Sequence, residues 1–278
     1  MKIGILHPGS MGVSVARSAI NSGFEVAWAS EGRSDATIAR ASEHGLQDVG
    51  TVSALVAASE IILSIGPPDA ATAVADVVKG HGYKGIFVDC NAISPMRMRQ
   101  IAESLEAAGA RVVDGGIVGN PAWVPNKTFL YVSGPDAATV ASHFHEGPLI
   151  ARVMDGKAVG DASAFKMCYA AYTKGTTAIL CALLAAADEL GVRDAVNAHW
   201  EIDQAGRAGD RQEVVSNVTQ KAWRWTGEMH EIAATFASVG LPDGFHEAAA
   251  TLYQRLEGLK DGPHPTPIED VLQALKSK

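Results

Sequence analysis

Two glycines that follow the first apolar run of the chain have a spacing suited to holding a phosphate. Residues 3–6 are apolar, a helical Ala- and Val-rich segment begins near residue 12, and a turn of sequence HPGSMG joins them. A strand, a tight turn and a helix in this order direct backbone N–H groups at an anion. The turn therefore predicts a dinucleotide site made by Pro8, Gly9, Ser10, Met11 and Gly12. An ordinary corner of an α/β protein is the alternative, because His7 replaces the first glycine of G-x-G-x-x-G.

Lys166 is the side chain best suited to moving a proton. It lies in a long apolar segment, between Phe165 and Met167. An ionised lysine there is costly unless it faces a cleft or a partner, and a desolvated lysine exchanges a proton near neutral pH. At about 100° per residue, Thr173 lies on the same side of a helix and Lys174 somewhat further round. A solvated surface lysine is the alternative.

The loop after the second apolar strand indicates which dinucleotide is bound. An acid in this loop binds the ribose 2′-OH of NAD, whereas a basic side chain accommodates the 2′-phosphate of NADP. Ser30 stands near the place of the acid, and Arg33 and Ser34 could both donate to a phosphate. Glu31 argues for NAD. The loop favours NADP and leaves NAD open, and a solvated turn that caps a helix is the alternative.

Two further apolar strands end in turns that would border the same crevice. The segment IILSIGPP at 61–68 ends in glycine and proline, which cannot continue a strand, and it brings Ile65, Gly66 and Pro67 to the strand end. Asn91 follows the next strand and could offer an amide to a ligand. Shaping a turn is an equally good explanation of Asn91.

Composition excludes several classes of partner. The 278-residue chain has a net charge of −8 and no Lys- or Arg-rich block, which argues against nucleic acid and anionic membrane. Its longest apolar run, at 178–187, is about half of the roughly 20 residues that span a bilayer. Three cysteines in apolar contexts and a start directly in a strand favour the cytoplasm. The nine histidines form no metal-binding pattern, so no metal site is predicted.

Strand and helix patterns divide the chain in two. Apolar strands are expected at 2–6, 25–29, 61–65, 86–89, 111–114 and 128–133, and helices at 12–22, 35–44, 69–78 and 96–108. This alternation predicts a parallel sheet covered on both faces. From about residue 160 only helices are expected, at 161–190, 194–205, 211–239, 244–258 and 268–276. We predict an α/β Rossmann domain over 1–157 and an all-α domain over 158–278.

These elements and motifs together resemble the β-hydroxyacid dehydrogenase family over nearly the whole chain. This family includes 6-phosphogluconate and 3-hydroxyisobutyrate dehydrogenases and, more distantly, imine reductases. Residues 9–12 match its G-x-M-G turn, and residues 114–120 stand at its substrate loop. The segment 160–166 ends on Lys166, at the position of the catalytic lysine of the family. The closest likeness is to a branch of 6-phosphogluconate dehydrogenase-like proteins with their own helical C-terminal domain.

The resemblance implies roles for several residues and exposes departures. Lys166 would exchange the hydroxyl proton of the substrate while a hydride passes to or from nicotinamide. Two asparagines that follow the lysine in the family are Tyr169 and Ala170 here, and the serine of the substrate loop is Val118. Both changes weaken the case for a carboxylate-bearing hydroxyacid substrate. The substrate residues that the resemblance suggests are Val118, Gly119, Asn120, Tyr169, Thr173, Lys174, Glu228 and Glu231.

The expected function is an NADP-dependent oxidoreductase of a small polar alcohol or carbonyl, with Lys166 as general acid and base. Reduction of an imine is one alternative, because the lost asparagine matters less for that reaction. A redox sensor that binds NADP(H) without catalysis is another. The family also implies a homodimer through the C-terminal helical domain. For Glu228 and Glu231, an amphipathic helix at a subunit interface is an alternative to substrate contact.

Overall fold

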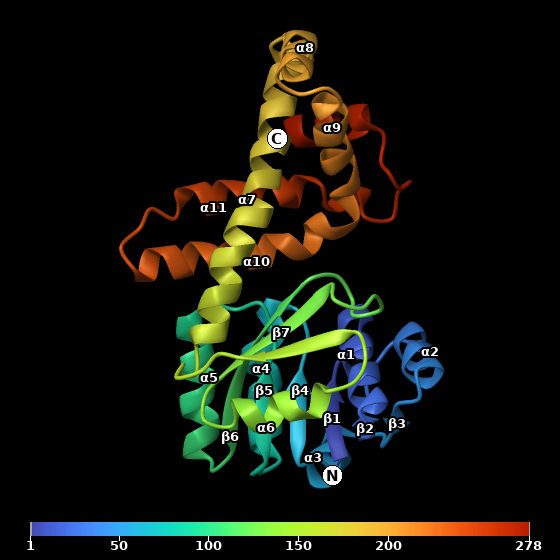
Figure 1. Ribbon diagram of the computed structural model, residues 1–278, viewed down its shortest axis with the longest axis vertical. Coiled ribbons are helices and arrows are strands. Elements are labelled where there is room, and N and C mark those ends of the chain that lie inside the picture. Colours follow the sequence, from blue (N-terminus) through green and yellow to red (C-terminus); the bar gives the residue numbers. More distant parts are fainter. Residues whose placement is uncertain (1, 278) are drawn as a thin grey trace. The chain divides into compact units, whose positions relative to one another are not determined.

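The computed structural model describes residues 2–277, which form two compact units (Figure 1). The first unit ends at Met167 and the second begins at Cys168. The boundary expected between residues 157 and 158 precedes this division, because the first turns of the long helix α7 (Asp161–Glu189) pack within the first unit. The fold class is confirmed: an α/β Rossmann unit is followed by an all-helical unit.

A single eight-stranded sheet forms the centre of the first unit. Its strands are β1 (Lys2–Leu6), β2 (Glu25–Trp28), β3 (Gln47–Asp48), β4 (Ile61–Ser64), β5 (Ile86–Asp89), β6 (Arg111–Val118), β7 (Thr128–Ser133) and β8 (Leu149–Val153). Their order in the sheet is β3-β2-β1-β4-β5-β6-β7-β8. The sheet is parallel, as expected, except that β6 and β7 pair antiparallel. A short loop rather than a helix joins these two strands, and a short loop can only return the chain in the opposite direction.

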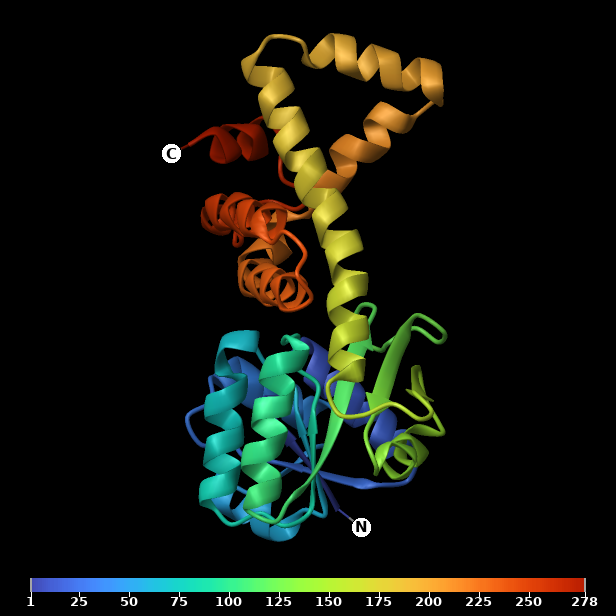
Figure 2. The same cartoon turned by 90° about the vertical axis from the view of Figure 1, so that its left-hand side faces the viewer.

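Helices cover both faces of the sheet. One face carries α1 (Ser10–Asn21), α2 (Asp35–Glu43) and α6 (Ala137–Ala141), and the other carries α3 (Val52–Ala58), α4 (Ala71–Gly80) and α5 (Pro95–Ala107). Figure 2 shows α4 and α5, in teal and green, standing against one face. Alternate strand residues feed two separate cores: Ile5 and Leu63 belong to one, and Ile62 and Phe87 to the other. The short β3, β8, α3 and α6 were not predicted.

The order of the strands places a switch point at β1. β1 has β2 on one side and β4 on the other, so the connections from β1 and from β4 leave in opposite directions. In such sheets, ligands bind beyond the carboxyl ends of the strands at this switch point. The turns after β1, β2, β4, β5 and β6 all lie at this edge.

The second unit contains the rest of α7 and five further helices. These are α8 (Arg193–Asp203), α9 (Arg207–Asn217), α10 (Thr219–Ser238), α11 (Gly244–Arg255) and α12 (Ile268–Lys276). The single helix expected over 211–239 is two helices, with a break at Val218. α10 and α11 pack side by side (Figure 1), burying Met229, Ala249 and Tyr253.

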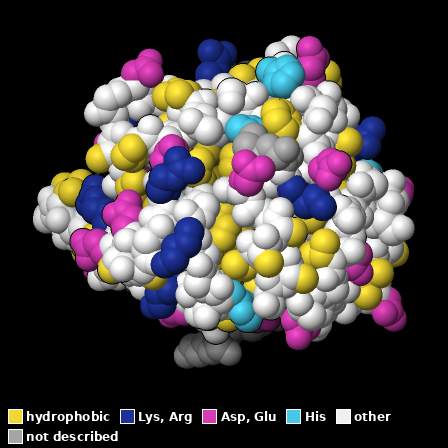
Figure 3. All heavy atoms as spheres, turned by 90° about the horizontal axis from the view of Figure 1, so that it is seen from below, with side chains coloured by type: hydrophobic (Ala, Val, Ile, Leu, Met, Phe, Trp, Pro, Cys, Tyr) yellow, Lys and Arg dark blue, Asp and Glu magenta, His cyan; other side chains and the backbone are white. Residues whose placement is uncertain are grey.

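α7 is long and apolar enough to cross a membrane by length and composition, although 44% of the apolar window is buried within the protein. The core helix of a soluble protein passes the same test. Figure 3 shows acidic and basic side chains interspersed with apolar ones over the face seen from below. That face therefore presents no field of one sign to nucleic acid or anionic lipid.

Candidate active site

The predicted site residues form two groups, one in each unit. In the first unit, the turns after five strands carry Pro8 to Gly12, Ser30 to Ser34, Ile65 to Pro67, Asn91, and Val118 to Asn120. Lys166 belongs to the same unit. The second group lies in the second unit and consists of Tyr169, Thr173, Lys174, Glu228 and Glu231.

The turn after β1 has the geometry of a phosphate-binding loop. His7 adopts a left-handed backbone with φ of 64°, and its carbonyl accepts a hydrogen bond from Gly9 N at 2.7 Å. A Cβ on Gly12 would lie 2.7 Å from the same carbonyl, so only glycine fits there. A Cβ on Gly9 would meet nothing closer than 4.0 Å. No side chain caps the N-terminus of α1, so the first-turn N–H groups are placed to meet an anion.

The loop after β2 presents Arg33 and Ser34 beside this turn. The N–H of Arg33 donates to Ser30 O at 3.0 Å, and Ser30 N donates to Asp48 Oδ1 at 3.2 Å. Ser34 is the N-cap residue of α2, but its hydroxyl pairs with Thr37 Oγ1 at 3.1 Å instead of capping the helix. Partial burial lowers the pKa of Arg33 from its ordinary value. The guanidinium is a half-buried cation at the edge of the crevice.

Asn91 braces two strand ends. Its Oδ1 accepts from Gly66 N at 2.6 Å, and its Nδ2 donates to Ser64 Oγ and to Asp89 Oδ2, each at 3.1 Å. Both amide hydrogens of this buried side chain are therefore engaged within the protein. The turn-shaping explanation describes what Asn91 does in this structure. Its predicted part in cofactor binding becomes an indirect one, through the position of Gly66.

Lys166 is held on β6 by close backbone packing. Its ammonium donates to Ile117 O at 2.7 Å, one residue before the Val118–Asn120 loop. A Cβ on Gly116 would lie 2.8 Å from Ala162 O and 3.2 Å from Lys166 Cβ, so the first turn of α7 lies directly on the strand. Lys166 thus points along β6 toward the loop that the sequence assigns to substrate.

Asp114 fixes the start of the helix that carries this lysine, a role that the sequence did not reveal. Its buried carboxylate accepts from Ser163 Oγ at 2.6 Å, Ser163 N at 2.8 Å and Gly160 N at 2.9 Å. These are N-terminal groups of α7, which favour a negative charge. Burial raises the pKa of Asp114 from its ordinary value, while the bonds from Ser163 and Gly160 lower it. An acid directly after two valines of an expected strand was the available signal.

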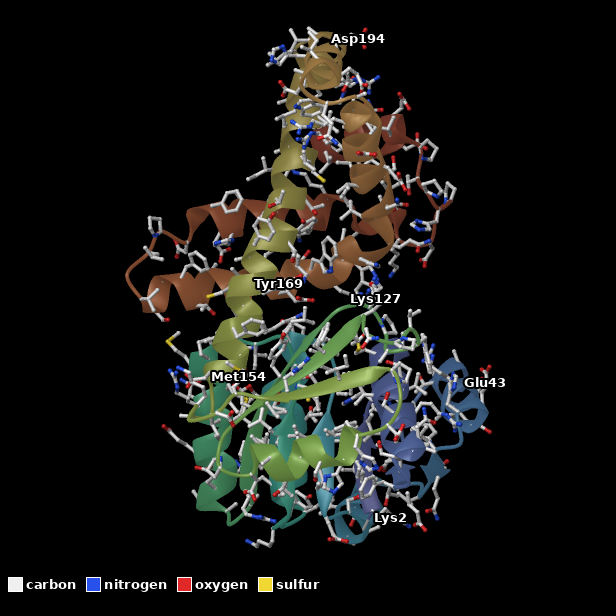
Figure 4. All side chains as sticks on the ribbon, viewed as in Figure 1. Lys2, Glu43, Lys127, Met154, Tyr169 and Asp194 are labelled. Atoms are coloured by element: carbon white, nitrogen blue, oxygen red, sulfur yellow. The ribbon has the colours of Figure 1, made fainter. Side chains whose placement is uncertain are left out.

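The loop after β6 reverses the direction of the chain. Gly119 has a φ of 121°, and a Cβ there would collide with Lys127 O. Thr128 Oγ1 donates to Asn120 O at 2.6 Å. Ala122 N donates to the buried Ser14 Oγ at 2.8 Å, which ties the loop to α1. The predicted substrate loop and the phosphate-binding turn are therefore joined through one serine. Lys127, at the end of the loop, is labelled in Figure 4.

The second group centres on an ion pair between α7 and α10. Lys174 Nζ lies 2.7 Å from Glu228 Oε2, with only 10% and 16% of the two side chains exposed. Lys174 Nζ also lies 5.4 Å from the Trp225 ring centre, and Tyr253 OH donates to Lys174 O at 2.5 Å. Glu231 is buried on α10. The structure brings Lys174 and Glu228 together, as a shared site requires.

Tyr169 and Thr173 are exposed on α7, where Figure 4 labels Tyr169. Thr173 Oγ1 donates back to Tyr169 O at 3.3 Å. Ala170, at the position of a family asparagine, is buried. Among residues 2–277, no group of three His, Cys, Asp or Glu side chains could hold a metal ion.

Comparison with known proteins decides the family. Residues 2–144 match the NAD binding domain of 6-phosphogluconate dehydrogenase. The chain is also 30% identical over 196 residues to an uncharacterized 28.5 kDa protein of Methanothermus fervidus, covering 70% of this chain and 74% of that one. The chain belongs to the family that carries this NAD-binding domain. Residues 187–256 match a further domain, of unknown function (DUF1932).

Solved structures of this 6-phosphogluconate dehydrogenase-like family share the fold. A conserved protein described as structurally similar to 3-hydroxyacid dehydrogenases has a TM-score of 0.68 and 25% identity, with full coverage of both chains. The 3-hydroxyisobutyrate dehydrogenase of Mycobacterium tuberculosis has a TM-score of 0.70 and 15% identity, covering 99% of each chain. A reductive aminase of Aspergillus terreus, solved with NADPH, has a TM-score of 0.57 and 17% identity over 98% of each chain.

The residues of the first unit fit a nicotinamide dinucleotide. The uncapped start of α1 and the open space at Gly9 are features that a phosphate would use. The chain has the fold of an NAD(P)-dependent oxidoreductase, and a nicotinamide dinucleotide is its cofactor class.

Proposed function

We propose that this protein is an NADP-dependent oxidoreductase that interconverts a small polar alcohol and its carbonyl, with Lys166 as general acid and base. The observation that carries the proposal is the placement of Lys166. Asp114 and Gly116 fix the first turn of α7 on β6, and the Lys166 ammonium lies 2.7 Å from Ile117 O beside the Val118–Asn120 loop. A proton donor is thus placed at the carboxyl edge of a dinucleotide-binding sheet.

The protein's own contribution would be position and a proton. The nicotinamide, when bound, supplies or accepts the hydride. Lys166 would hold the substrate oxygen by a hydrogen bond and give it a proton during reduction, or take that proton during oxidation. The bond to Ile117 O restrains the ammonium along β6, so fewer orientations compete with the productive one.

The preference for NADP is supported by the loop after β2. Arg33 is a half-buried cation beside the phosphate-binding turn, and Ser30 stands where an acid would bind the ribose of NAD. Glu31 is exposed, and its backbone N–H donates to Gly50 O at 2.9 Å, so the backbone of this residue is held in the turn. We expect Arg33→Ala to weaken binding of NADP about tenfold or more and of NAD much less. Equal losses in titration calorimetry would contradict this preference.

Reduction of an imine is the second candidate, favoured by two specific residues. Ala170 and Val118 replace an amide and a hydroxyl that would hold a carboxylate-bearing hydroxyacid. The buried pair of Lys174 and Glu228 offers a different set of polar groups in the second unit. A reductive aminase shares the fold, which makes a C=N substrate compatible with the architecture.

One assay separates these candidates. Nicotinamide absorbance is followed with NADP or NADPH over a panel of alcohols, hydroxyacids, ketones and imines, and the substrate class turned over decides between them. Lys166→Met keeps most of the length of the side chain and removes its ammonium group. We expect a loss in kcat of about 100-fold or more with an unchanged Kd for NADPH. Lys157→Met, at an exposed position in the turn after β8, is the matched control. Turnover unaffected by Lys166→Met would contradict the lysine assignment, and tight NADPH binding without any turnover would favour the redox sensor.

We also propose a homodimer formed through α7. Apolar side chains repeat along an exposed face of this helix at Tyr172, Ile179 and Leu183, and Leu190 directly follows its last residue; their exposures are 73%, 49%, 37% and 75%. Their spacing of seven, four and seven residues is that of a helix seam. Ile179→Glu should give a monomer in sedimentation, whereas Val239→Glu, at an exposed position outside α7, should not. A monomeric wild type would contradict this assembly.

A cytoplasmic location is part of the proposal. All three cysteines are free, with Cys90 and Cys181 buried and Cys168 exposed. A free exposed thiol is typical of proteins in a reducing compartment, where thiols stay reduced. The net charge of −8 supports a small-molecule substrate rather than nucleic acid or a membrane surface.

A further inference from the structure

His7 occupies a backbone conformation that normally selects glycine. Its φ is 64°, in the left-handed region, where a side chain introduces strain and glycine does not. Histidine is among the residues that tolerate this region best, yet glycine would still be the less strained choice. A strained residue in a binding turn suggests that its side chain does something there.

The His7 ring lies at the switch point between β1 and β4. A Cβ on Gly66, in the turn after β4, would lie 3.7 Å from His7 Nδ1 and 3.9 Å from His7 Cγ. Asn91 holds this turn through the 2.6 Å bond from Gly66 N to its Oδ1. The ring therefore packs between the phosphate-binding turn and a braced strand end, with part of the residue reaching the surface.

The two ring nitrogens have different surroundings. Nδ1 is buried and has no hydrogen-bond partner among residues 2–277. A neutral imidazole carries one N–H, and burying an unpaired donor costs more than burying an unpaired lone pair. We therefore place the hydrogen on Nε2, which makes this nitrogen the donor that the ring can offer to a ligand.

Arg33 is the charge that acts on this ring. Burial, and then the positive charge of Arg33, lower the pKa of His7 to about 4, so the ring is neutral at pH 7. Asp89, at the end of β5, is hydrogen-bonded to Asn91 N and Nδ2. The turn after β4 adds no charged side chain next to the ring, because Gly66 and Pro67 form it.

We propose that His7 contacts the bound dinucleotide and, together with Arg33, selects the form that carries a 2′-phosphate. The inference rests on the proposed function, since it requires a dinucleotide at the turn after β1. His7 Nε2–H would donate to the phosphate while Arg33 pairs with its charge. The buried Nδ1 keeps its lone pair, so the ring stays neutral and offers the single donor on Nε2 to the phosphate.

Binding of two nicotinamide-free probes tests this role without any turnover. The probes are 2′-phospho-ADP-ribose and ADP-ribose, which differ only in the 2′-phosphate, and binding is measured by titration calorimetry. His7→Gly should fold normally, because glycine accepts the left-handed backbone. We expect His7→Gly to weaken binding of the phosphorylated probe about tenfold or more, and of ADP-ribose less than about threefold. His7→Asn, which tolerates the same backbone and keeps an N–H donor, should recover part of the loss.

The difference between the two probes decides the role of His7. Equal weakening for the two probes, or no weakening, would overturn this role and leave the dinucleotide site intact. Failure of wild type to bind either probe would overturn the dinucleotide site, and with it both proposals.

Discussion

Asp114 and Ser163 join β6 to the first turn of α7 through two hydrogen bonds, from Ser163 Oγ at 2.6 Å and from Ser163 N at 2.8 Å. One buried carboxylate on a central strand thereby sets the position of the helix that carries Lys166. Gly160 N donates to the same carboxylate at 2.9 Å. Proton-transfer chemistry at Lys166 would depend on a residue that touches neither substrate nor cofactor.

Asp114→Asn is expected to destabilise the protein and misplace Lys166. The amide that replaces Oδ2 would face the N–H groups of Gly160 and Ser163, so donors would oppose donors. We expect a loss of about 2–3 kcal/mol in the free energy of unfolding, measured with urea, and a lower kcat. Ser163→Ala, which removes only the hydroxyl bond, should cost about 1 kcal/mol. Equal costs for the two variants would contradict the capping role of the carboxylate.

Gly9→Ala is expected to separate cofactor binding from folding. A Cβ there meets no protein atom closer than 4.0 Å, so the free energy of unfolding should fall by no more than the cost of alanine at an N-cap, about 1 kcal/mol. The methyl group would stand where a phosphate approaches the backbone, and we expect dinucleotide affinity to fall about tenfold. Gly12→Ala is the contrast, because its Cβ would lie 2.7 Å from His7 O and should cost about 1–3 kcal/mol of stability. Unchanged affinity in Gly9→Ala would count against a phosphate at this turn.

Asp89 should make stability depend on pH in the acid-to-neutral range. The pKa of Asp89 is raised to about 7. Burial is the largest cause, hydrogen bonds from Asn91 oppose it, and the Asp114 carboxyl adds to it. The folded protein therefore holds a proton that the unfolded chain, with a pKa of 3.8, releases. The contribution of this group to stability is fully present below pH 3.8, falls as pH rises toward about 7, and is constant above.

Urea unfolding of wild type and Asp89→Asn between pH 5 and 8 measures this effect. The stability of wild type relative to the variant should fall with pH by at most about 1.4 kcal/mol per pH unit, and level off near pH 7. Other titrating groups are common to both proteins and cancel in the difference. A difference that does not vary with pH would show that Asp89 titrates alike in both states.

Lys174 and Glu228 are expected to behave as a coupled pair. Lys174→Met would leave Glu228 as a largely buried charge, at a cost of about 3–5 kcal/mol in the free energy of unfolding. Adding Glu228→Gln removes that charge and should recover part of the loss. The four proteins of this double-mutant cycle, compared by urea unfolding, give the coupling energy. Additive effects would mean that the 2.7 Å contact contributes nothing beyond its separate parts.

Local sequence patterns were sufficient for the fold class and for the turn after β1. Apolar strands that alternate with helices leave few arrangements other than a covered parallel sheet, and Gly12 is needed for a contact within its own turn. The helical second half was evident from its periodicity. The strand at 128–133 was predicted, but its antiparallel direction was not, and neither were the short β3 and β8, because strand direction and edge pairing depend on partners far along the chain.

The tertiary structure decided what the candidate side chains do. Sequence pointed to Lys166 but not to the hold of Asp114 on its helix, which runs through Ser163, 49 positions from Asp114 along the chain. The sequence leaves Asn91 open between a ligand contact and a turn residue, and only the hydrogen bonds of the folded chain show that its amide braces Gly66 and Asp89. In the sequence His7 is only a replacement for a glycine, whereas in the structure its ring lies against Gly66. Residue types and spacing determine which chemistry is possible. Burial and hydrogen bonding arise from packing between distant segments, and they determine which side chains are available for that chemistry.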